Sequence, residues 1–335
     1  MIDFDLVTAK TPTDAIKLSA ASQTVQQGAQ VRLVAGGTTL IDLMKLDVET
    51  PKQVVDINRL DLGQIEKQSD GALRIGALVR NSDLADNEIV RRDYLVLAQA
   101  LLSGASPQLR NMATTGGNLL QRTRCTYFRD LSYPDCNKRT PGSGCAAIGG
   151  HNRTHAVLGT SDHCIATHPS DMCVAMTALE ARIHIQGASG DREVAISDFY
   201  QLPADSPHLE NVLQPGDLIT YVILPPPTAG TKSVYLKLRD RDAYEFALAS
   251  AAVIVNLSDG QIKKARVALG GVGTKPWRSP EAEHELLGKS PAAVHFRAAA
   301  EAALRRARPQ TDNGFKIELA KRCIVRALLM ATANT

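Results

Sequence analysis

The stretch VRLVAGGTTLIDLMKL, residues 31–46, decides the fold of the N-terminal part of the chain. VRLVA at 31–35 has the apolar, β-branched character of a buried strand, and LIDLMKL at 40–46 has the apolar spacing of a short helix. Gly36 and Gly37 separate them and leave bare backbone that an anion can approach. The strand, glycine pair, threonine pair and helix start form a reasonable pyrophosphate cradle. Taken alone, a strand–helix turn that merely needs glycine is the simpler explanation.

A second glycine-rich turn, ATTGGN at 113–118, repeats this arrangement. Neither turn has the GxxxxGK[ST] pattern of a P-loop or the GxGxxG pattern of the Rossmann fold, so neither class is supported. Two turns with small hydroxyl residues and paired glycines flank one α/β region. Together they predict a phosphorylated cofactor lying between them.

Hydrophobic periodicity divides the chain into three parts. Strand and helix patterns alternate in a compact α/β unit over residues 1–60 and in a second unit over 61–226. Three consecutive prolines mark the second boundary, and residues 227–335 form an α+β module. That module contains a strand hairpin with an Asp-Gly turn, then two helices around 279–306 and 314–332.

Local signals also predict individual helix ends and strands. Thr13 and Asp14 are expected to cap the first helix, and Asn81 or Ser82 is expected to cap a later helix. Ser170 is expected to cap a helix over residues 170–183. EVAISDFY, residues 193–200, is interpreted as a strand.

Four cysteines lie in an irregular stretch, 122–168, that lacks sustained periodicity. A structureless stretch of this length inside a compact domain is usually functional. Zinc knuckles and low-potential ferredoxin motifs need closely paired cysteines, which the spacing C-x10-C-x8-C-x18-C does not provide. The spacing indicates a loop wrapped around a metal without identifying that metal. The four cysteines are Cys125, Cys136, Cys145 and Cys164.

Histidines in the same stretch leave a mixed Cys/His zinc site open as an alternative. They are His151, His155, His163 and His168. Cys173 and Cys323 occupy apolar helical patterns, so both are interpreted as core residues.

The bulk composition is that of an ordinary globular protein. Of the 335 residues, 44% are hydrophobic, and 38 basic and 35 acidic residues give a net charge of +3. The charges are spread along the chain, so no nucleic-acid partner is expected. No apolar run is long enough to span a membrane, and the N-terminus has neither a signal-peptide core nor a twin arginine.

The ordered motifs resemble the FAD-binding subunits of molybdenum hydroxylases, which include xanthine dehydrogenases, carbon monoxide dehydrogenases and aldehyde oxidoreductases. The resemblance covers nearly the whole chain and is strongest to the FAD subunit type of bacterial periplasmic aldehyde oxidoreductases. The motifs that carry it are LVAGGTTLIDLMK, LRIGALV, QLRNMATTGGNLL, HPSDMCVAMTAL, LPPP, KLRDRDAYEFALASAAV and RVALGGVGTKPWR.

This resemblance implies an α+β fold. A two-part, vanillyl-alcohol-oxidase-like FAD-binding α/β region would precede a C-terminal domain like that of carbon monoxide dehydrogenase flavoproteins. It implies that Cys125, Cys136, Cys145 and Cys164 hold a [4Fe–4S] cluster in the insert 122–168. It also implies that residues 34–39 hold the pyrophosphate and that Lys237 lies near the isoalloxazine ring. The complete set of implied FAD contacts is Val34, Ala35, Gly36, Gly37, Thr38, Thr39, Thr114, Thr115, Gly116, Gly117, Asn118, Asp171 and Lys237.

The resemblance further implies a heterotrimer that oxidises aldehydes to carboxylic acids. A large partner subunit would carry the molybdopterin, and a small one would carry [2Fe–2S] clusters that pass electrons to this FAD and on to an external acceptor. No catalytic acid–base residues are expected in this chain. A partner with a signal sequence would export the complex to the periplasm, and a cytoplasmic location remains the alternative. The functional alternatives are a subunit of a 4-hydroxybenzoyl-CoA reductase-like complex and a zinc-stabilised nucleotide-binding module.

Overall fold

The N-terminal subdomain contains a small parallel sheet and two helices. The computed structural model describes residues 1–333. Three parallel strands run in the order β1-β3-β2, and Val55 on the central strand pairs with Val7 and with Leu33. The elements are β1 (Asp5–Thr8), α1 (Pro12–Ser19), β2 (Val31–Val34), α2 (Leu40–Lys45) and β3 (Gln53–Asp56).

The second subdomain is built around a five-stranded antiparallel sheet with the order β4-β5-β8-β6-β7. Its strands are β4 (Ile65–Lys67), β5 (Leu73–Gly76), β6 (Arg182–Gly187), β7 (Gly190–Ala195) and β8 (Leu218–Leu224). Its helices are α3 (Asn81–Asp86), α4 (Glu88–Asp93), α5 (Leu95–Ser103), α6 (Pro107–Met112), α7 (Thr115–Leu119), α9 (Asp171–Ala178) and α10 (Ile196–Phe199). Helices α5 and α9 are buried along most of their length and form the centre of the largest apolar core.

The C-terminal domain places a four-stranded antiparallel sheet, with the order β12-β11-β10-β9, against three helices. Its elements are β9 (Thr231–Leu238), β10 (Ala249–Ser258), β11 (Gln261–Gly270), β12 (Trp277–Arg278), α11 (Pro280–Leu286), α12 (Ala293–Leu304) and α13 (Phe315–Thr332). One face of the sheet packs on α11 and α13, and the other packs on α5 and α9 of the preceding subdomain. The two parts of the chain therefore share a continuous core.

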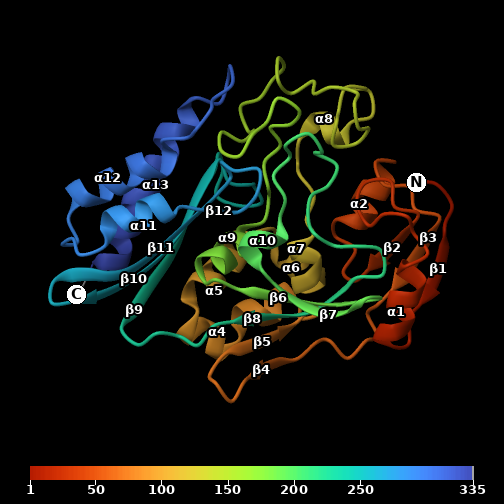
Figure 1. Ribbon diagram of the computed structural model, residues 1–335, viewed down its shortest axis with the longest axis horizontal. Helices are drawn as coiled ribbons and strands as arrows, with labels where there is room; N and C mark the ends of the chain where they lie inside the picture. The colour runs from red at the N-terminus through yellow and green to blue at the C-terminus, as the bar shows by residue number, and fades with distance from the viewer. Residues whose placement is uncertain (334–335) are drawn as a thin grey trace.

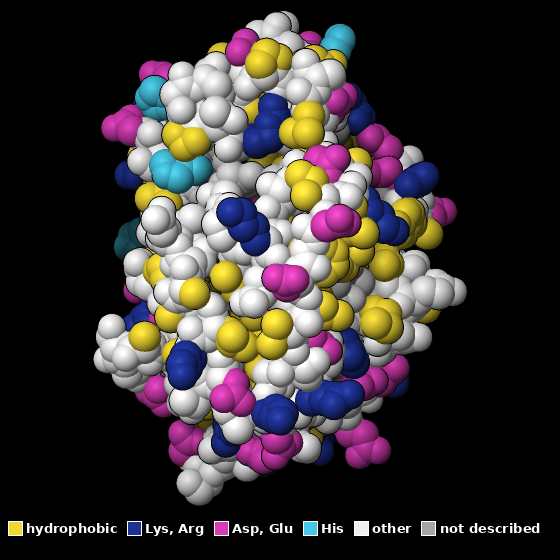
Figure 2. Space-filling model, turned by 90° about the vertical axis from the view of Figure 1, so that its right-hand side faces the viewer, with side chains coloured by type: hydrophobic (Ala, Val, Ile, Leu, Met, Phe, Trp, Pro, Cys, Tyr) yellow, Lys and Arg dark blue, Asp and Glu magenta, His cyan; other side chains and the backbone are white. Residues whose placement is uncertain are grey.

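The cysteine-containing insert forms irregular loops with one short helix, α8 (Thr126–Arg129). Figure 1 shows these loops at the top of the view, between the blue C-terminal helices and the red N-terminal subdomain. Figure 2 shows that basic and acidic side chains are intermixed over one side of the molecule. Within residues 1–333, no helix has both the length and the apolar character needed to cross a membrane.

The predicted fold class is confirmed, but four local predictions are wrong. Thr11, not the pair at 13–14, caps α1, because its side chain accepts from the N–H of Asp14 at 3.1 Å. Helix α3 begins after Arg80 with no side-chain cap. The second half of 193–200 forms α10 instead of extending a strand.

The fourth wrong prediction concerns the C-terminal helices, because three helices form where two were predicted. The predicted cap at Ser170 is confirmed, since its side chain accepts from the N–H of Cys173 at 3.1 Å. The predicted Asp-Gly turn also joins β10 to β11, with positive φ at Asp259 and Gly260.

Candidate functional site

The two glycine-rich turns are in direct contact. A Cβ atom at Gly36 would lie 1.9 Å from the carbonyl oxygen of Met112, so only glycine permits this approach. Gly37 adopts a φ of +71°, which side-chain-bearing residues rarely adopt. The amide of Asn58 donates to the Ala35 carbonyl at 3.0 Å and strengthens the first turn from the neighbouring strand end. The sequence therefore folds so that the turn after β2 packs on the segment before α7.

A cavity of about 140 Å³ opens between the two turns. We call it the turn cavity. The predicted FAD contacts that line it are Val34, Ala35, Gly36, Gly37, Thr38, Thr39, Thr114 and Gly117. Thr114 also caps α7, because its side-chain oxygen accepts from the N–H of Gly117 at 3.2 Å.

Thr115 and Gly116, also predicted as FAD contacts, bond to the protein backbone. The N–H and the hydroxyl of Thr115 both donate to the Val79 carbonyl, at 2.9 and 3.2 Å. The N–H of Gly116 donates to the Ala77 carbonyl at 2.8 Å, and a Cβ here would lie 3.1 Å from the Ala77 methyl. These two residues hold α7 against the segment that follows β5.

Lys237 and Asp171 form an ion pair at the wall of a larger cavity of about 280 Å³. We call it the lysine cavity, and Asn118 also lines it. The ammonium of Lys237 is 2.8 Å from the Asp171 carboxylate and donates to the Ser103 carbonyl at 3.1 Å. The hydroxyl of Tyr235 donates to the same carboxylate. Asp171 is thus held in place by two donors from β9 while it starts α9.

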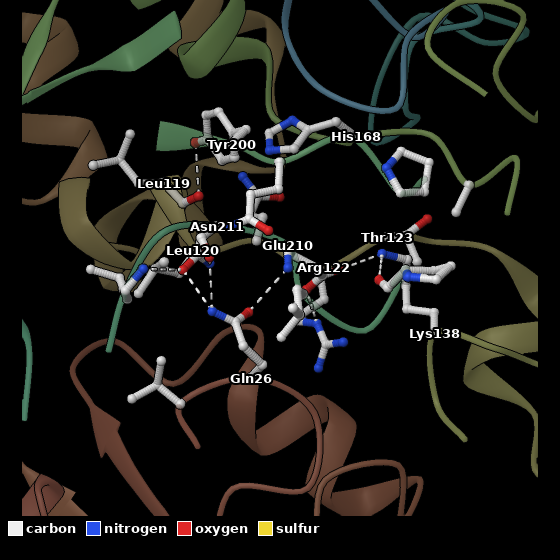
Figure 3. A pocket seen from close by; sticks show the side chains of 18 of the residues that line it. Gln26, Leu119, Leu120, Arg122, Thr123, Lys138, His168, Tyr200, Glu210 and Asn211 are labelled. Atoms are coloured by element: carbon white, nitrogen blue, oxygen red, sulfur yellow. Dashed lines mark hydrogen bonds and ion pairs between the residues drawn. The ribbon is translucent and has the colours of Figure 1, made fainter. Parts of the chain in front are cut away.

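The three cavities adjoin one another in a row. The turn cavity and the lysine cavity share Thr38, Thr39 and Gly117. A third cavity of about 150 Å³, the Gln26 cavity, joins the other end of the turn cavity at Leu33 and Arg122. Figure 3 shows the Gln26 cavity between the N-terminal subdomain, the end of α7 and the 200–211 loop. The glycine turns therefore line the middle one of the three cavities.

A buried charge network borders the Gln26 cavity. Arg122 pairs with Glu49 and with Glu210, and Lys138 lies 2.8 Å from Glu210. Arg32 on β2 lies 2.7 Å from Glu49. Burial alone would raise the pKa of Glu210, but the two neighbouring cations lower it to about 2. The network therefore ties the N-terminal subdomain to the segment after α7 and to the insert.

The insert gathers the four predicted ligand cysteines, all of which are free thiols. Cys136 and Cys145 face each other in an isolated antiparallel bridge. Cys125 packs beside Cys136 in one small apolar cluster and beside Cys145 in another. Burial, with smaller contributions from Cys136 and Cys164, raises the pKa of Cys125 to about 12. Burial also raises the pKa of the Cys145 and Cys164 thiols, and neighbouring cysteines of the insert contribute to each of these increases.

The structure does not show a formed metal site. Within residues 1–333, no group of three or more His, Cys, Asp or Glu side chains is arranged to hold a metal ion. One histidine of the insert contacts a cysteine, since Nε2 of His155 lies 3.1 Å from Sγ of Cys125. Burial lowers the pKa of His155 to about 4, so this imidazole is neutral. Cys173 and Cys323 lie in the core, as predicted.

Sequence reasoning missed several polar residues of the lysine cavity. They are Asn81, Arg110, Gln121, Arg124, Arg241 and Glu245. Arg124 lies within the QRTRC segment directly before the first cysteine, and Arg241 lies within KLRDRD. Both arginines lie beside motifs that the sequence analysis had recognised. Charged residues on loops usually face solvent, and no local sequence pattern distinguishes an arginine that lines a cavity from one that is exposed.

The fold and the run of cavities define a flavoprotein-like class, in which two subdomains joined to an α+β domain enclose a dinucleotide. A family profile described as "FAD binding domain in molybdopterin dehydrogenase" matches residues 3–227. A second, "CO dehydrogenase flavoprotein C-terminal domain", matches residues 234–331. The chain belongs to the FAD-binding subunits of the molybdenum hydroxylase family and is an oxidoreductase subunit that binds FAD.

Individual relatives agree with this assignment. The chain is 52% identical over 315 residues to the aldehyde oxidoreductase FAD-binding subunit PaoB of Escherichia coli, covering 94% of this chain and 95% of that protein. It is 30% identical to the glyceraldehyde dehydrogenase medium chain of Sulfolobus acidocaldarius, covering 86% and 82%. A solved structure of reconstituted CO dehydrogenase from Oligotropha carboxidovorans matches with a TM-score of 0.78 and 25% identity, covering both chains completely.

Proposed function

We propose that this chain is the electron-transfer subunit of a heterotrimeric molybdenum enzyme that oxidises aldehydes to carboxylic acids. The row of three adjoining cavities along the two glycine turns carries this proposal, together with the likeness to PaoB. Each aldehyde and water would give an acid, two protons and two electrons on a molybdopterin-bearing partner. FAD supplies a two-electron acceptor that can pass electrons onward. A [2Fe–2S] partner would deliver electrons to this chain, and an external acceptor would remove them.

FAD would extend along all three cavities. The pyrophosphate would lie in the turn cavity against residues 34–39, where bare glycine backbone permits close contact. The flavin would lie in the lysine cavity, with Asp171 near its hydroxyl-bearing chain and Lys237 near its ring. The adenosine would enter the Gln26 cavity, which combines apolar walls with amide groups. We propose domain limits of 1–60, 61–226 and 227–335 for this arrangement.

The insert would hold a [4Fe–4S] cluster through Cys125, Cys136, Cys145 and Cys164. Four free cysteines in one loop system offer the donor set that such clusters use, and their mutual electrostatic influence supports a common site. Iron binding would release the thiol protons, because a cysteine ligand binds the metal as its thiolate. The cluster would serve as an additional electron relay beside the flavin. The assembled complex would be exported to the periplasm with a partner that carries the signal sequence.

Metal and flavin analysis of the purified protein tests this function. We expect about one FAD and about four irons per chain, with overlapping flavin and iron–sulfur absorption. Cys125→Ser should lower the iron content, whereas Cys173→Ser should leave it unchanged because Cys173 is a core residue outside the insert. Zinc without flavin in the wild-type chain would contradict the proposal and leave a structural metal module.

A further inference from the structure

Arg124 stands between the cysteine insert and the lysine cavity. It immediately precedes Cys125 in the chain. Its side chain lines the lysine cavity and also a smaller cavity of about 80 Å³ on the other side, which Cys125 and His155 line. Asp171 and Phe246 belong to the same shared wall. Arg124 therefore faces the space proposed for the flavin while its backbone belongs to the insert.

The guanidinium of Arg124 is held by two neighbouring side chains, but one of its N–H donors has no hydrogen-bond partner within residues 1–333. Its Nη1 lies 3.1 Å from the Asp42 carboxylate, and its Cζ lies 5.0 Å from the centre of the Phe246 ring. Its buried Nε–H has no hydrogen-bond partner among residues 1–333. A buried donor without a partner costs free energy, so a ligand that accepts from it gains affinity.

The wall of the lysine cavity carries more cationic than anionic side chains, although Lys237 pairs with Asp171 and Arg241 pairs with Glu245. Arg110, Arg124, Lys237 and Arg241 line it, against the carboxylates of Asp171 and Glu245. Asp42 does not neutralise Arg124 alone, because the guanidinium of Arg129 lies 2.9 Å from the same carboxylate. One carboxylate facing two guanidinium groups leaves a net cation at the wall.

A second unsatisfied group complements this donor. Asn81 lines the same cavity, and within the described chain its buried Oδ1 atom has no hydrogen-bond partner. The pyrimidine edge of a flavin ring carries both N–H donors and carbonyl acceptors. The cavity thus offers a free donor and a free acceptor to one polar, planar group.

We propose that Arg124 is a flavin-binding residue, whose guanidinium donates to the ring of bound FAD and stabilises the negative charge that the ring gains on reduction. This inference rests on the proposed placement of FAD. A cation beside the flavin favours the reduced, more negative form, and the rigid fork of arginine suits a planar acceptor. Asp42 acts as a positioning residue because it holds the fork at the cavity wall.

Arg129 supplies a matched control. It carries the same charge, pairs with the same Asp42 carboxylate and is similarly buried, with 22% of its side chain exposed against 29% for Arg124. Among the described residues that line the lysine cavity and the turn cavity, Arg129 does not occur. A substitution there removes a neighbouring charge without changing the cavity wall.

The experiment is a spectroelectrochemical titration of the flavin in the assembled complex, with FAD and iron assayed on each sample. Arg124→Gln should reduce the preference for reduced over oxidised flavin at least tenfold, which lowers the two-electron midpoint potential by about 30 mV or more. Arg129→Gln should shift the midpoint much less than Arg124→Gln, because Arg129 influences Arg124 only through the shared Asp42 carboxylate and does not line the cavity. Arg124→Lys should restore part of the shift, because it keeps the charge but not the fork.

Each outcome decides the proposal. Selective loss of FAD from Arg124→Gln, but not from Arg129→Gln, would also support it. Equal shifts in the two glutamine variants, or no shift in Arg124→Gln with full FAD content, would overturn it. A wild-type complex without FAD would instead refute the proposed function, so the two failures are distinguishable.

Discussion

The two glycine-rich turns are similar in sequence but use their polar groups differently. After β2, Thr39 begins α2 without a side-chain cap, and Thr38 and Thr39 line two adjoining cavities. In the second turn, Thr114 caps α7, and Thr115 bonds to the Val79 carbonyl. The Thr38 and Thr39 hydroxyls thus make no hydrogen bond within residues 1–333, whereas the hydroxyls of the second turn bond to the backbone, even though Thr114 also lines the turn cavity. The same residue pattern can therefore be a binding motif or a structural one.

The largest expected effect comes from separating the turns. Gly36→Ala would place a methyl group 1.9 Å from the Met112 carbonyl oxygen, so the backbone must move. We expect the free energy of unfolding to fall by at least roughly 1–3 kcal/mol. We also expect the protein to lose bound FAD. Thermal unfolding and the FAD-to-protein ratio measure the two effects.

Gly76→Ala is the control for Gly36→Ala. A Cβ at Gly76 would lie 2.1 Å from the Leu62 carbonyl oxygen, a comparable collision in β5. We expect similar destabilisation with FAD retained in the folded fraction. If Gly36→Ala kept its full FAD content, the contact between the turns would not be needed for binding.

Acid should weaken the charge network that connects the two turn regions. Arg122 follows the second turn and pairs with Glu210, whose pKa is about 2 in the folded chain against an ordinary value of 4.5. The folded state binds this proton less readily than the unfolded state. The contribution of ionised Glu210 to the free energy of unfolding is therefore complete above pH 4.5 and is lost as the pH falls toward 2. The loss is roughly 3 kcal/mol at most.

Denaturant unfolding between pH 5 and pH 2.5 measures this dependence. Glu210→Gln should be less stable than the wild type near pH 5 and should show a shallower decline on acidification. Parallel curves for the two proteins would show that Glu210 does not carry the dependence.

Removing the cap of the second turn should have a smaller effect. Thr114→Ala removes the side-chain oxygen that accepts from the Gly117 N–H at 3.2 Å. Loss of a helix cap typically costs about 1 kcal/mol. Chemical denaturation measures it, and Thr114→Ser should recover most of the loss because serine retains the oxygen. An unchanged unfolding midpoint in Thr114→Ala would argue against a structural role.

The smallest effect on stability is expected at the first turn. Thr39→Ala removes no cap, so stability should change by less than about 0.5 kcal/mol. FAD affinity should nevertheless fall roughly fivefold, the equivalent of one hydrogen bond of about 1 kcal/mol. Titration of flavin-free protein with FAD measures this. A stability loss equal to that of Thr114→Ala, with unchanged affinity, would remove the contrast between the turns.

Local sequence determined the features that depend on neighbouring residues. Strand β2, the glycine turn and helix α2 follow from residues 31–46. Ser170 and the Asp259–Gly260 turn act where their residue types predict, because caps and tight turns are set by side chains and φ preferences within a few positions. The family resemblance identified FAD as the cofactor, and the family profile supports it.

Only the tertiary structure decided which polar groups meet across long separations. Arg124 and Asp42 are 82 residues apart, and no periodicity links them. Gly116 packs against Ala77 because the chain brings α7 onto the segment after β5, and its predicted contact with FAD stays a prediction. Side-chain roles of this kind depend on how separate elements pack, and packing is set by the whole core. Local pattern therefore located the two turns, and tertiary contact determined that Thr38 and Thr39 line the cavities while Thr115 bonds to the Val79 carbonyl.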